Sequence, residues 1–399
     1  MKKDKILFVV QRYGMEVNGG AEYHCRVLAE HLLERYEVAV FTSCARDYMP
    51  WDNFYPVGMS KLNNVAVHRF PVEKTKDEAY VRELSAKVNR GEKGAETEWI
   101  EEVGPFCPKL IAALKSEGTL YKAIIFFGYA FYPTVVGLQS GLKHTILIPT
   151  AHDESNIYKE MCYRTLQSAS AFLYNSVEER QFLFDRFGTG NKPGRLTCVG
   201  IELPDVSNGK LPERDIQDQD YVVYVGRVSH GKNFMQLNRY FIQYKRSHNT
   251  NLKLLVVGRV DNEEKLAYHE DIVYMGYVSE EDKTLLMKNA ALLIMPSKYE
   301  SLSLVILESM ALGRPVLVNG DCEVLKGQCI RSNAGLYYSS YAEFEKALDY
   351  MLTDSNAYTQ MAENGLEFVR NNYSWQYVVE NVSSLIEEIG RNREGEQLV

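Results

Sequence analysis

Two cationic side chains follow an apolar run in the second half of the chain. In YVVYVGRVSHGKNF, the run Tyr221–Val225 predicts a strand that ends at Gly226, and the next helix should begin near Asn233. Arg227 and Lys232 lie on the turn between that strand and that helix. Two cations on one turn can converge on a concentrated anion, such as the diphosphate leaving group of a nucleotide. The alternative interpretation is a pair of ordinary surface cations.

Two glutamates, Glu300 and Glu308, lie in the segment MPSKYESLSLVILESMALGRPVLVNG, which reads as strand, loop, helix, turn and strand. A helix that starts at the carboxyl edge of a parallel sheet favours an anionic ligand. Carboxylates of a retaining glycosidase lie about 5 Å apart, whereas eight residues of continuous helix span about 12 Å. Two carboxylates that reach different hydroxyl groups of an elongated ligand therefore fit better. The alternative is a helix start capped by Ser301 or Ser303, with Glu308 on a solvated face.

Two weaker signals lie in the first half of the chain. Gly19 and Gly20 precede a predicted helix, Ala21–Leu33, and paired glycines let a backbone approach a ligand closely. Their spacing is not the G-x-G-x-x-G dinucleotide fingerprint, which disfavours a nicotinamide dehydrogenase. His152 directly follows the predicted strand Thr145–Pro149, so it can point into a cleft. A plain loop and a structural histidine are the alternatives.

Short apolar runs alternate with amphipathic stretches along the chain, which predicts parallel strands buried on both faces and joined by right-handed crossovers. The remaining predicted strands are Ile6–Val10, Val38–Thr42, Val65–Phe70, Ala123–Phe127, Ala171–Tyr174, Leu252–Val257, Ile272–Met275, Ala291–Met295 and Pro315–Val318. The polar segment Ile201–Asp220 separates two series of strands and is interpreted as a linker. We therefore predict an α/β fold of two Rossmann-like, doubly wound domains. The charged region 73–117 is expected to be a partly exposed helical insertion, either for a substrate or without a function.

Bulk properties exclude several classes of protein. The net charge is -8 and the basic residues are spread along the chain, which disfavours nucleic-acid binding. Seven scattered cysteines without a C-x-x-C pair indicate neither a zinc site nor a disulfide framework. Reduced, buried thiols are typical of a cytoplasmic protein. The apolar run near the amino terminus is too short for a signal peptide, and no transmembrane segment is predicted.

Together these residues give a chain that resembles the family-four glycosyltransferases of the GT-B fold, a large retaining class that uses nucleotide sugars. Gly226-Arg227…Lys232 is similar to the family's G-R-x4-K, and Glu300…Glu308 to its E-x7-E. The glycine pair and His152 match the amino-terminal glycine loop and the cleft histidine. The resemblance implies two domains facing across a cleft. Residues 1–203 would form the acceptor side and 204–375 the donor side, with a helix from about 376 to 399 packed back on the first domain.

The resemblance also implies a role for each site residue. Arg227 and Lys232 would bind the donor diphosphate, Glu308 would hold the ribose hydroxyls, and Glu300 would lie by the donor sugar. His152 would lie near the transferred sugar, and Gly19 and Gly20 would line the cleft. Backbone amides that would touch sugar or phosphate belong to Leu302, Ser303, Leu304 and Val305. Leu302-Ser303 stands where many members have Phe-Gly, so the Ser303 hydroxyl is expected to add a contact or cap the helix.

The expected reaction is the transfer of a hexose from a UDP- or GDP-linked sugar with retained anomeric configuration. Two cations and a helix N-terminus can take up the charge of the leaving group without a metal, and the chain has no D-x-D motif at a strand end. No cofactor is expected, and the two domains should close on the donor. The acceptor would be a growing surface polysaccharide or a lipid-linked oligosaccharide at the inner membrane face. A nonhydrolysing sugar-nucleotide epimerase and a noncatalytic nucleotide-sugar-binding protein stay open as alternatives.

Overall fold

A computed structural model describes residues 3–17, 19–196, 199–207, 221–260 and 266–396. The chain divides into two compact units: Met1–Gly200 with Trp375–Val399 form unit 1, and Ile201–Ser374 form unit 2. The sequence placed these boundaries after residues 203 and 375. Residues 208–220 of the predicted linker lie outside the described residues.

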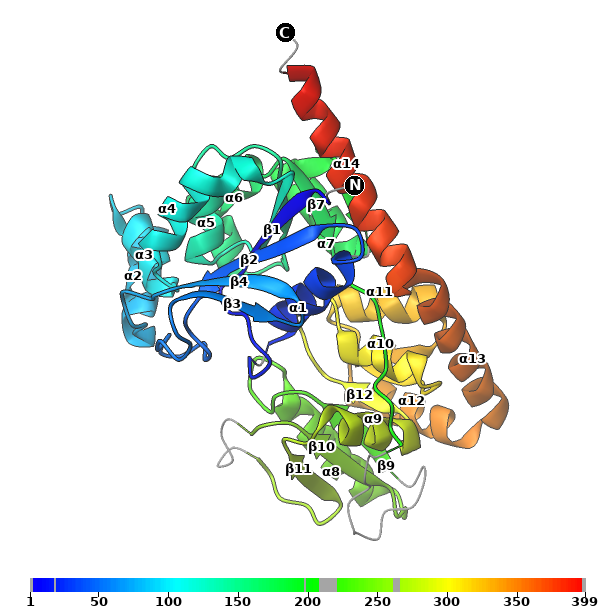
Figure 1. The fold of residues 1–399 in the computed structure, drawn as a ribbon. Coiled ribbons are helices and arrows are strands. Elements are labelled where there is room, and N and C mark those ends of the chain that lie inside the picture. Colours follow the sequence, from blue (N-terminus) through cyan, green and yellow to red (C-terminus); the bar gives the residue numbers. More distant parts are fainter. Residues whose placement is uncertain (1–2, 18, 197–198, 208–220, 261–265, 397–399) are drawn as a thin grey trace. The chain divides into compact units, whose positions relative to one another are not determined.

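Unit 1 is built on an eight-stranded sheet with the order β3-β4-β2-β1-β5-β6-β7-β8 (Figure 1). Neighbouring strands are parallel except β3 and β4, which are antiparallel. Asn63 and Asn64 join these two strands with φ angles of 47° and 67°, the positive values that a tight two-residue hairpin requires. The strands are β1 Lys5–Val9, β2 Glu37–Ser43, β3 Gly58–Leu62, β4 Val65–Phe70, β5 Ala123–Phe127, β6 Thr145–Ile148, β7 Ala171–Tyr174 and β8 Gly194–Leu196.

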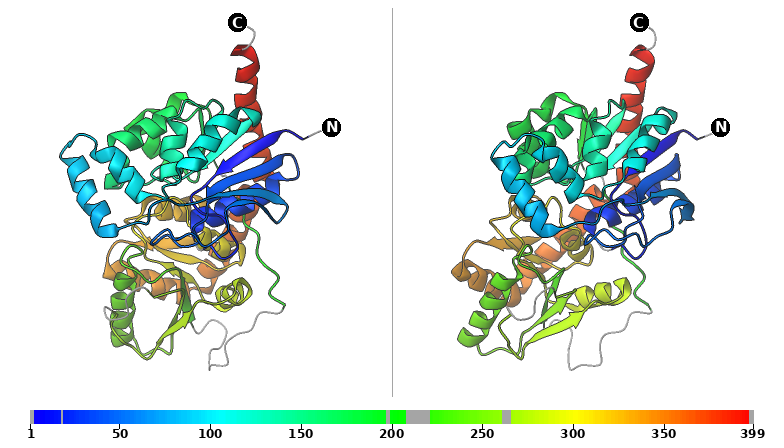
Figure 2. Two further views of the ribbon diagram at one scale, coloured as in Figure 1. Left: turned by 60° about the vertical axis from the view of Figure 1, so that its left-hand side comes forward. Right: turned by 90° about the vertical axis from the view of Figure 1, so that its left-hand side faces the viewer.

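Helices cover both faces of this sheet. They are α1 Gly20–Leu32, α2 Glu78–Asn89, α3 Ala95–Val103, α4 Pro108–Glu117, α5 Tyr132–Leu138, α6 Glu160–Ser168, α7 Val177–Phe187 and α14 Trp375–Glu396. The charged insertion 73–117 is helical, as predicted, and its helices α2 and α3 pack side by side (Figure 2). The last helix, α14, belongs to unit 1 because Val378, Val382 and Ile386 are buried in the same core as β1 and β5.

Unit 2 is built on a six-stranded, fully parallel sheet with the order β11-β10-β9-β12-β13-β14. Its strands are β9 Tyr221–Val225, β10 Lys253–Val257, β11 Ile272–Gly276, β12 Leu293–Met295, β13 Val316–Asn319 and β14 Gly335–Tyr338. Its helices are α8 Phe234–Ser247, α9 Glu280–Asn289, α10 Leu304–Ala311, α11 Glu323–Ser332, α12 Tyr341–Thr353 and α13 Ser355–Asn372. The prediction of two doubly wound α/β domains is thus confirmed, although strands β3, β8 and β14 were not predicted.

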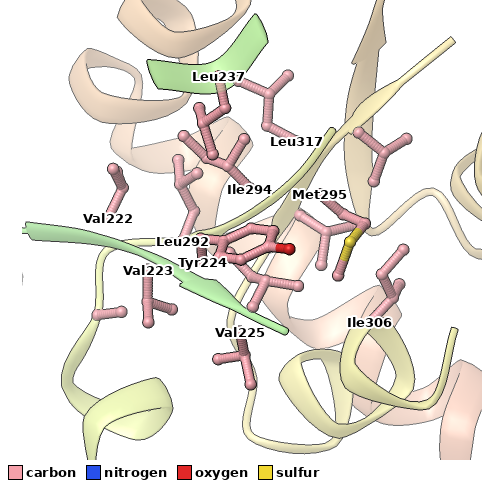
Figure 3. Packing of buried hydrophobic residues seen from close by; sticks show 14 of the residues in the cluster. Val222, Val223, Tyr224, Val225, Leu237, Leu292, Ile294, Met295, Ile306 and Leu317 are labelled. Atoms are coloured by element: carbon pink, nitrogen blue, oxygen red, sulfur yellow. The ribbon is translucent and has the colours of Figure 1, made fainter. Parts of the chain in front are cut away.

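The core of unit 2 explains why its central strands read as unbroken apolar runs. Side chains of β9 and β12 are packed on both sides of the sheet, against Leu237 of α8 and Ile306 of α10 (Figure 3). Every residue of β9 is buried. A strand covered on both faces carries no polar alternation, so only its ends are available for polar chemistry.

Candidate active site

The strand order of unit 2 identifies where a ligand can bind. Strands β9 and β12 are neighbours in the sheet. The chain passes from β9 to β10 on one side of this pair, and from β12 to β13 on the other side. Such a switch point opens a crevice at the carboxyl ends of the strands, which is where doubly wound sheets bind ligands. The loops that start at Gly226, Pro296 and Gly320 leave the sheet at this edge. Arg227, Lys232 and Glu300 lie on the first two of these loops, and Glu308 lies on the helix α10 that follows the second.

Two glycines allow the strand ends to touch backbone to backbone. Gly226 and Gly258 end β9 and β10 with φ angles of 152° and 136°. A Cβ atom on Gly258 would lie 2.1 Å from the Gly226 carbonyl oxygen, so only glycine fits there. Beyond this contact, the buried Tyr224 donates its hydroxyl hydrogen to the Arg227 carbonyl at 2.8 Å. This hydrogen bond fixes the backbone that carries the exposed Arg227 side chain.

The structure brings together two of the predicted site residues. Lys232 Nζ lies 2.6 Å from Glu300 Oε1, and the side chains are 34% and 11% exposed. The helix α10 begins only at Leu304, so Glu300 lies on the loop before it rather than on a helix continuous with Glu308. The helical spacing of about 12 Å therefore does not apply to this pair of glutamates. A half-buried ammonium thus stands at the switch point with a carboxylate as its partner.

Two asparagine amides, missed by the sequence analysis, hold the loops in place. Asn233 Nδ2 donates to the Pro296 carbonyl at 3.0 Å, and Asn319 Nδ2 donates to the same oxygen at 2.9 Å. Asn233 directly precedes α8 in the left-handed conformation, with φ of 54°, and Asn319 ends β13. One carbonyl therefore ties together the loops after β9, β12 and β13. Asparagine at a helix start and at a strand end is the sequence signal that marks both.

The N-terminus of α10 has no side-chain cap in the part of the chain that the structure describes. Ser303 is its N-cap residue, but within the described chain the Ser303 hydroxyl makes no capping hydrogen bond. Of the two expected roles of this hydroxyl, an added contact or a helix cap, the structure excludes the cap. Leu304 and Val305 begin the helix, and Leu302 packs against the core before it. The first N–H groups of a helix have no partner within the helix, so this terminus can accept an anion.

Glu308 is paired rather than solvated. Its carboxylate lies 3.1 Å from Lys283 Nζ of α9, and the two side chains are 15% and 14% exposed. Lys283 also contacts Glu280 at 2.6 Å. Burial opposes the charge of Lys283, but the two carboxylates outweigh it and raise the pKa of this lysine. Glu308 is thus oriented by a residue that the motif spacing gave no reason to select.

His152 lies at the carboxyl edge of the sheet in unit 1, after β6. Its Nε2 is 3.6 Å from Glu154 Oε2, and Glu154 also accepts a hydrogen bond from the Tyr129 hydroxyl at 2.5 Å. Burial opposes the ionisation of Glu154, yet the hydrogen bonds from His152 and Tyr129 lower its pKa overall. The histidine is therefore oriented by a carboxylate that stays ionised.

A fully buried carboxylate, Glu179 of α7, fixes the loop that carries His152. Glu179 Oε1 accepts from the Ala151 N–H and Oε2 from the Asn175 N–H, both at 2.6 Å. Burial raises the pKa of Glu179 to about 7, although these hydrogen bonds act in the opposite direction. The Ser176 hydroxyl accepts from the Glu179 N–H at 3.1 Å, which is half of a capping box. The S-x-x-E pattern was visible in the sequence, but the bond to Ala151 was not.

The glycine pair lies beside a buried ion pair. Helix α1 begins at Gly20 with Gly19 as its N-cap residue, one residue earlier than predicted. A Cβ atom on Gly19 would lie 2.1 Å from Glu22 Oε2, whereas one on Gly20 would meet nothing within 4 Å. Glu22 is paired with Arg12 at 2.5 Å, and both side chains are buried. A side chain on Gly19 would therefore displace the Glu22 carboxylate from its place beside Arg12. The neighbouring Asn18 lies outside the described residues.

Three further properties concern the described part of the chain only. No three side chains of His, Cys, Asp or Glu are grouped there in a way that would hold a metal ion. None of the helices found there combines the length and the apolarity that a membrane span needs. The six described cysteines are free and buried.

Comparisons with known proteins agree with the motifs. The family model of the group 1 glycosyl transferases matches residues 211–368. An uncharacterised glycosyltransferase of Methanocaldococcus jannaschii is 22% identical over 94% of this chain and 95% of its own. The capsular polysaccharide biosynthesis glycosyltransferase CapM of Staphylococcus aureus is 23% identical over 55% of this chain and 59% of its own.

Solved structures extend the likeness to the whole fold. Sucrose-phosphate synthase of Thermosynechococcus elongatus superposes with a TM-score of 0.70 at 18% identity, over 97% of this chain and 99% of its own. Anabaena HepE, solved with UDP and glucose, gives a TM-score of 0.66 at 14% identity, over 96% and 100%. We conclude that residues 211–368 match the group 1 glycosyl transferases and that the chain has the GT-B fold, as the family-four resemblance implies.

Proposed function

We propose that the protein transfers a hexose from a UDP- or GDP-linked sugar to a glycan or lipid-linked acceptor, with retention of the anomeric configuration and without a metal. The observation that carries this proposal is the Lys232–Glu300 pair at the switch point of unit 2, on the loop that leads into the uncapped N-terminus of α10. A diphosphate at that edge would meet the ammonium of Lys232, the guanidinium of Arg227 and the N–H groups of the helix.

The chemistry follows from where charge develops. When the bond between the anomeric carbon and the diphosphate oxygen breaks, negative charge accumulates on the diphosphate. Lys232 and Arg227 are placed before the reaction, so they stabilise that charge without reorganisation. The acceptor oxygen forms its bond to the anomeric carbon on the same face, and its proton passes to an oxygen of the departing diphosphate. Glu300 accepts hydrogen bonds from hydroxyls of the donor sugar.

The remaining site residues bind rather than react. Glu308 accepts hydrogen bonds from the ribose hydroxyls, and its ion pair with Lys283 holds it in place for that role. Backbone N–H groups from Ser303 to Val305 contact sugar or phosphate. In unit 1, His152 contributes to the transfer step while Gly19 lines the acceptor side. The UDP and glucose bound to Anabaena HepE support a nucleotide-sugar donor.

The acceptor class and the location rest on more general grounds. The capsular role of the Staphylococcus aureus relative supports a surface polysaccharide or its lipid-linked precursor as the acceptor. Free, buried cysteines support a reducing compartment. We place the protein in the cytoplasm, in peripheral contact with the inner membrane face where such acceptors are found.

The donor role is tested by single substitutions at the cations. Loss of one charge contact to a developing anion typically costs a factor of about 10² to 10³ in rate. Arg227→Ala and Lys232→Ala should therefore each lower kcat by about that factor, while Arg239→Ala, an exposed arginine of α8, leaves it unchanged. Thermal unfolding with UDP and GDP first identifies the donor base, and NMR of the product then gives its anomeric configuration. Normal turnover in both variants would refute the proposal. Conversion of the donor without any acceptor would instead favour the epimerase.

A further inference from the structure

Lys76 is a buried lysine at the carboxyl edge of the sheet in unit 1, and the donor chemistry gives it no role. Only 8% of the residue is exposed. Its Nζ lies 3.7 Å from the centroid of the Tyr48 ring and 5.9 Å from that of Trp51. Among the described residues, no carboxylate forms an ion pair with it. A buried cation without an anion is costly, so its retention calls for an explanation.

Three hydrogen bonds hold the backbone around Lys76. The Lys76 N–H donates to the Pro50 carbonyl at 2.8 Å. The next residue, Asp77, donates its N–H to Glu102 Oε1 at 2.8 Å and caps α2 by accepting from the Ala79 N–H at 2.8 Å. The direction of the Lys76 side chain is therefore set before any ligand arrives, as in a preorganised binding site.

The carboxylates nearest to Lys76 are already engaged. Glu102 pairs with Lys74 at 2.6 Å, and Glu78, on the exposed first turn of α2, pairs with Arg82 at 3.8 Å. Their attraction does not offset burial, which lowers the pKa of Lys76 to about 8. The amine thus remains largely protonated at neutral pH but lacks the hydration that normally accompanies its charge. A protonated amine that lacks its hydration is strongly stabilised when an anion binds to it.

A second cation and an exposed ring complete the surroundings. The Arg12 guanidinium lies 6.0 Å from the Tyr48 ring centroid and 5.9 Å from that of Trp51, so both cations flank the same two rings. Tyr48 itself is 40% exposed. A Cβ atom on Gly19 would come within 3.1 Å of Arg12 Nη2, which brings the start of α1 to this cluster. These residues follow β1, β2 and β4, at the sheet edge that also carries His152.

We propose that Lys76 binds an anionic group of the acceptor, a phosphate or a carboxylate, with Arg12 beside it and the exposed Tyr48 ring as a surface for the sugar. This proposal rests on the proposed function, since it assigns the substrate class of the same enzyme. A purely structural role would be met at least as well by a methionine, which fills the same space without a charge to desolvate. The contact with Tyr48 orients the amine but leaves it able to meet an anion.

Inorganic phosphate is the first probe. All chains compared should carry Lys232→Met, so that phosphate bound by the donor site does not contribute. The three tryptophans of the chain, Trp51, Trp99 and Trp375, belong to unit 1, so their fluorescence follows the unfolding of that unit. Phosphate up to about 50 mM should raise the unfolding midpoint of this chain by ligand linkage. Adding Lys76→Met should abolish the rise, while adding Lys109→Met, at an exposed lysine of α4, should not.

The results separate this proposal from the proposed function. An unchanged rise in the Lys76→Met chain, or no rise in any chain, would overturn the phosphate site. Binding of UDP or GDP by the Lys76→Met protein is measured independently and tests only the donor side. A soluble hexose 6-phosphate and a polyprenyl diphosphate in phosphatidylcholine vesicles distinguish the two sources of phosphate. Binding that depends on Lys76 identifies the source, and the lack of it for both would overturn the assignment to an acceptor.

The kinetic signature is a change confined to the acceptor. Once an anionic acceptor is in hand, Lys76→Met should raise its KM by about ten- to a hundredfold, as expected when one partner of a desolvated charge pair is removed. The KM for the donor should stay within about twofold, because none of the donor contacts proposed above involves Lys76. An equal rise in KM for a neutral analogue of the acceptor would show that the substitution acts through packing, and would overturn the proposal.

Discussion

Glu179 offers the sharpest test of how unit 1 holds the His152 loop. Its carboxylate is 2% exposed and accepts hydrogen bonds from the N–H groups of Ala151 and Asn175. Replacement by glutamine keeps the size of the side chain but removes its titration. The amide NH₂ also cannot accept one of these two bonds, so some stability is lost at every pH. The informative quantity is therefore how the difference in unfolding free energy between the two proteins changes with pH.

The sign and size of that change follow from linkage. Burial raises the pKa of Glu179 from 4.5 to about 7. Between these values the folded state holds more protons than the unfolded state, so the free energy of unfolding falls as pH rises. One pKa unit corresponds to about 1.4 kcal/mol. Relative to Glu179→Gln, the wild-type protein should therefore lose about 2.5 kcal/mol of stability between pH 5 and pH 8.

The assay is urea unfolding followed by tryptophan fluorescence, which reports on unit 1 alone. Both proteins should be measured at several pH values between 5 and 8. The same comparison in a His152→Asn background removes the titration of the neighbouring histidine. A difference that stays constant across this range would mean that the carboxyl group is ionised throughout. That result would refute the reasoning that burial outweighs the two hydrogen bonds.

Two further predictions concern the lysine–glutamate pairs of unit 2. Lys283→Met leaves the Glu308 carboxylate buried without its cation and should destabilise unit 2 by about 3 kcal/mol, seen as faster hydrogen exchange in α10. The control Glu280→Gln removes only the exposed partner of Lys283 and should cost less than about 1 kcal/mol. Glu300→Gln releases Lys232 and should tighten UDP binding by about two- to fivefold while lowering kcat. Calorimetry with UDP checks this, and weaker binding in Glu300→Gln would contradict it.

The fold was predictable where strands are buried on both faces. Runs such as Tyr221–Val225 are apolar throughout because helices cover both sides of the sheet, and the predicted bounds of that strand agree with β9. Strands β3, β8 and β14 lie at sheet edges, where burial is partial and the residues are mixed. Edge strands carry a weaker pattern for that reason. The Asn63-Asn64 pair was a usable hairpin signal for β3.

The site was predictable only as far as spacing along the chain determines it. A turn after a strand brings Arg227 and Lys232 to one sheet edge, so their sequence positions suffice. The partners of the motif residues come from other helices, as Lys283 does for Glu308. The bond from Ala151 to Glu179 likewise joins the loop after β6 to α7. Lys76 has no motif at all, because its significance depends on its burial and on the lack of an ion pair with a carboxylate among the described residues.

The ion pairs of unit 2 bear on how binding leads to reaction. Without a donor, Glu300 forms an ion pair with the ammonium of Lys232. The carboxylate partly neutralises this cation and holds it in position. We infer that a diphosphate competes for Lys232 and thereby frees Glu300 to accept hydrogen bonds from the sugar that arrives with it. UDP alone would separate Lys232 from Glu300 and leave Glu300 without a hydrogen-bond partner. A complete UDP-sugar would supply partners to both Lys232 and Glu300. The affinity of Glu300→Gln for UDP measures that cost, and discrimination in favour of the intact donor is its consequence.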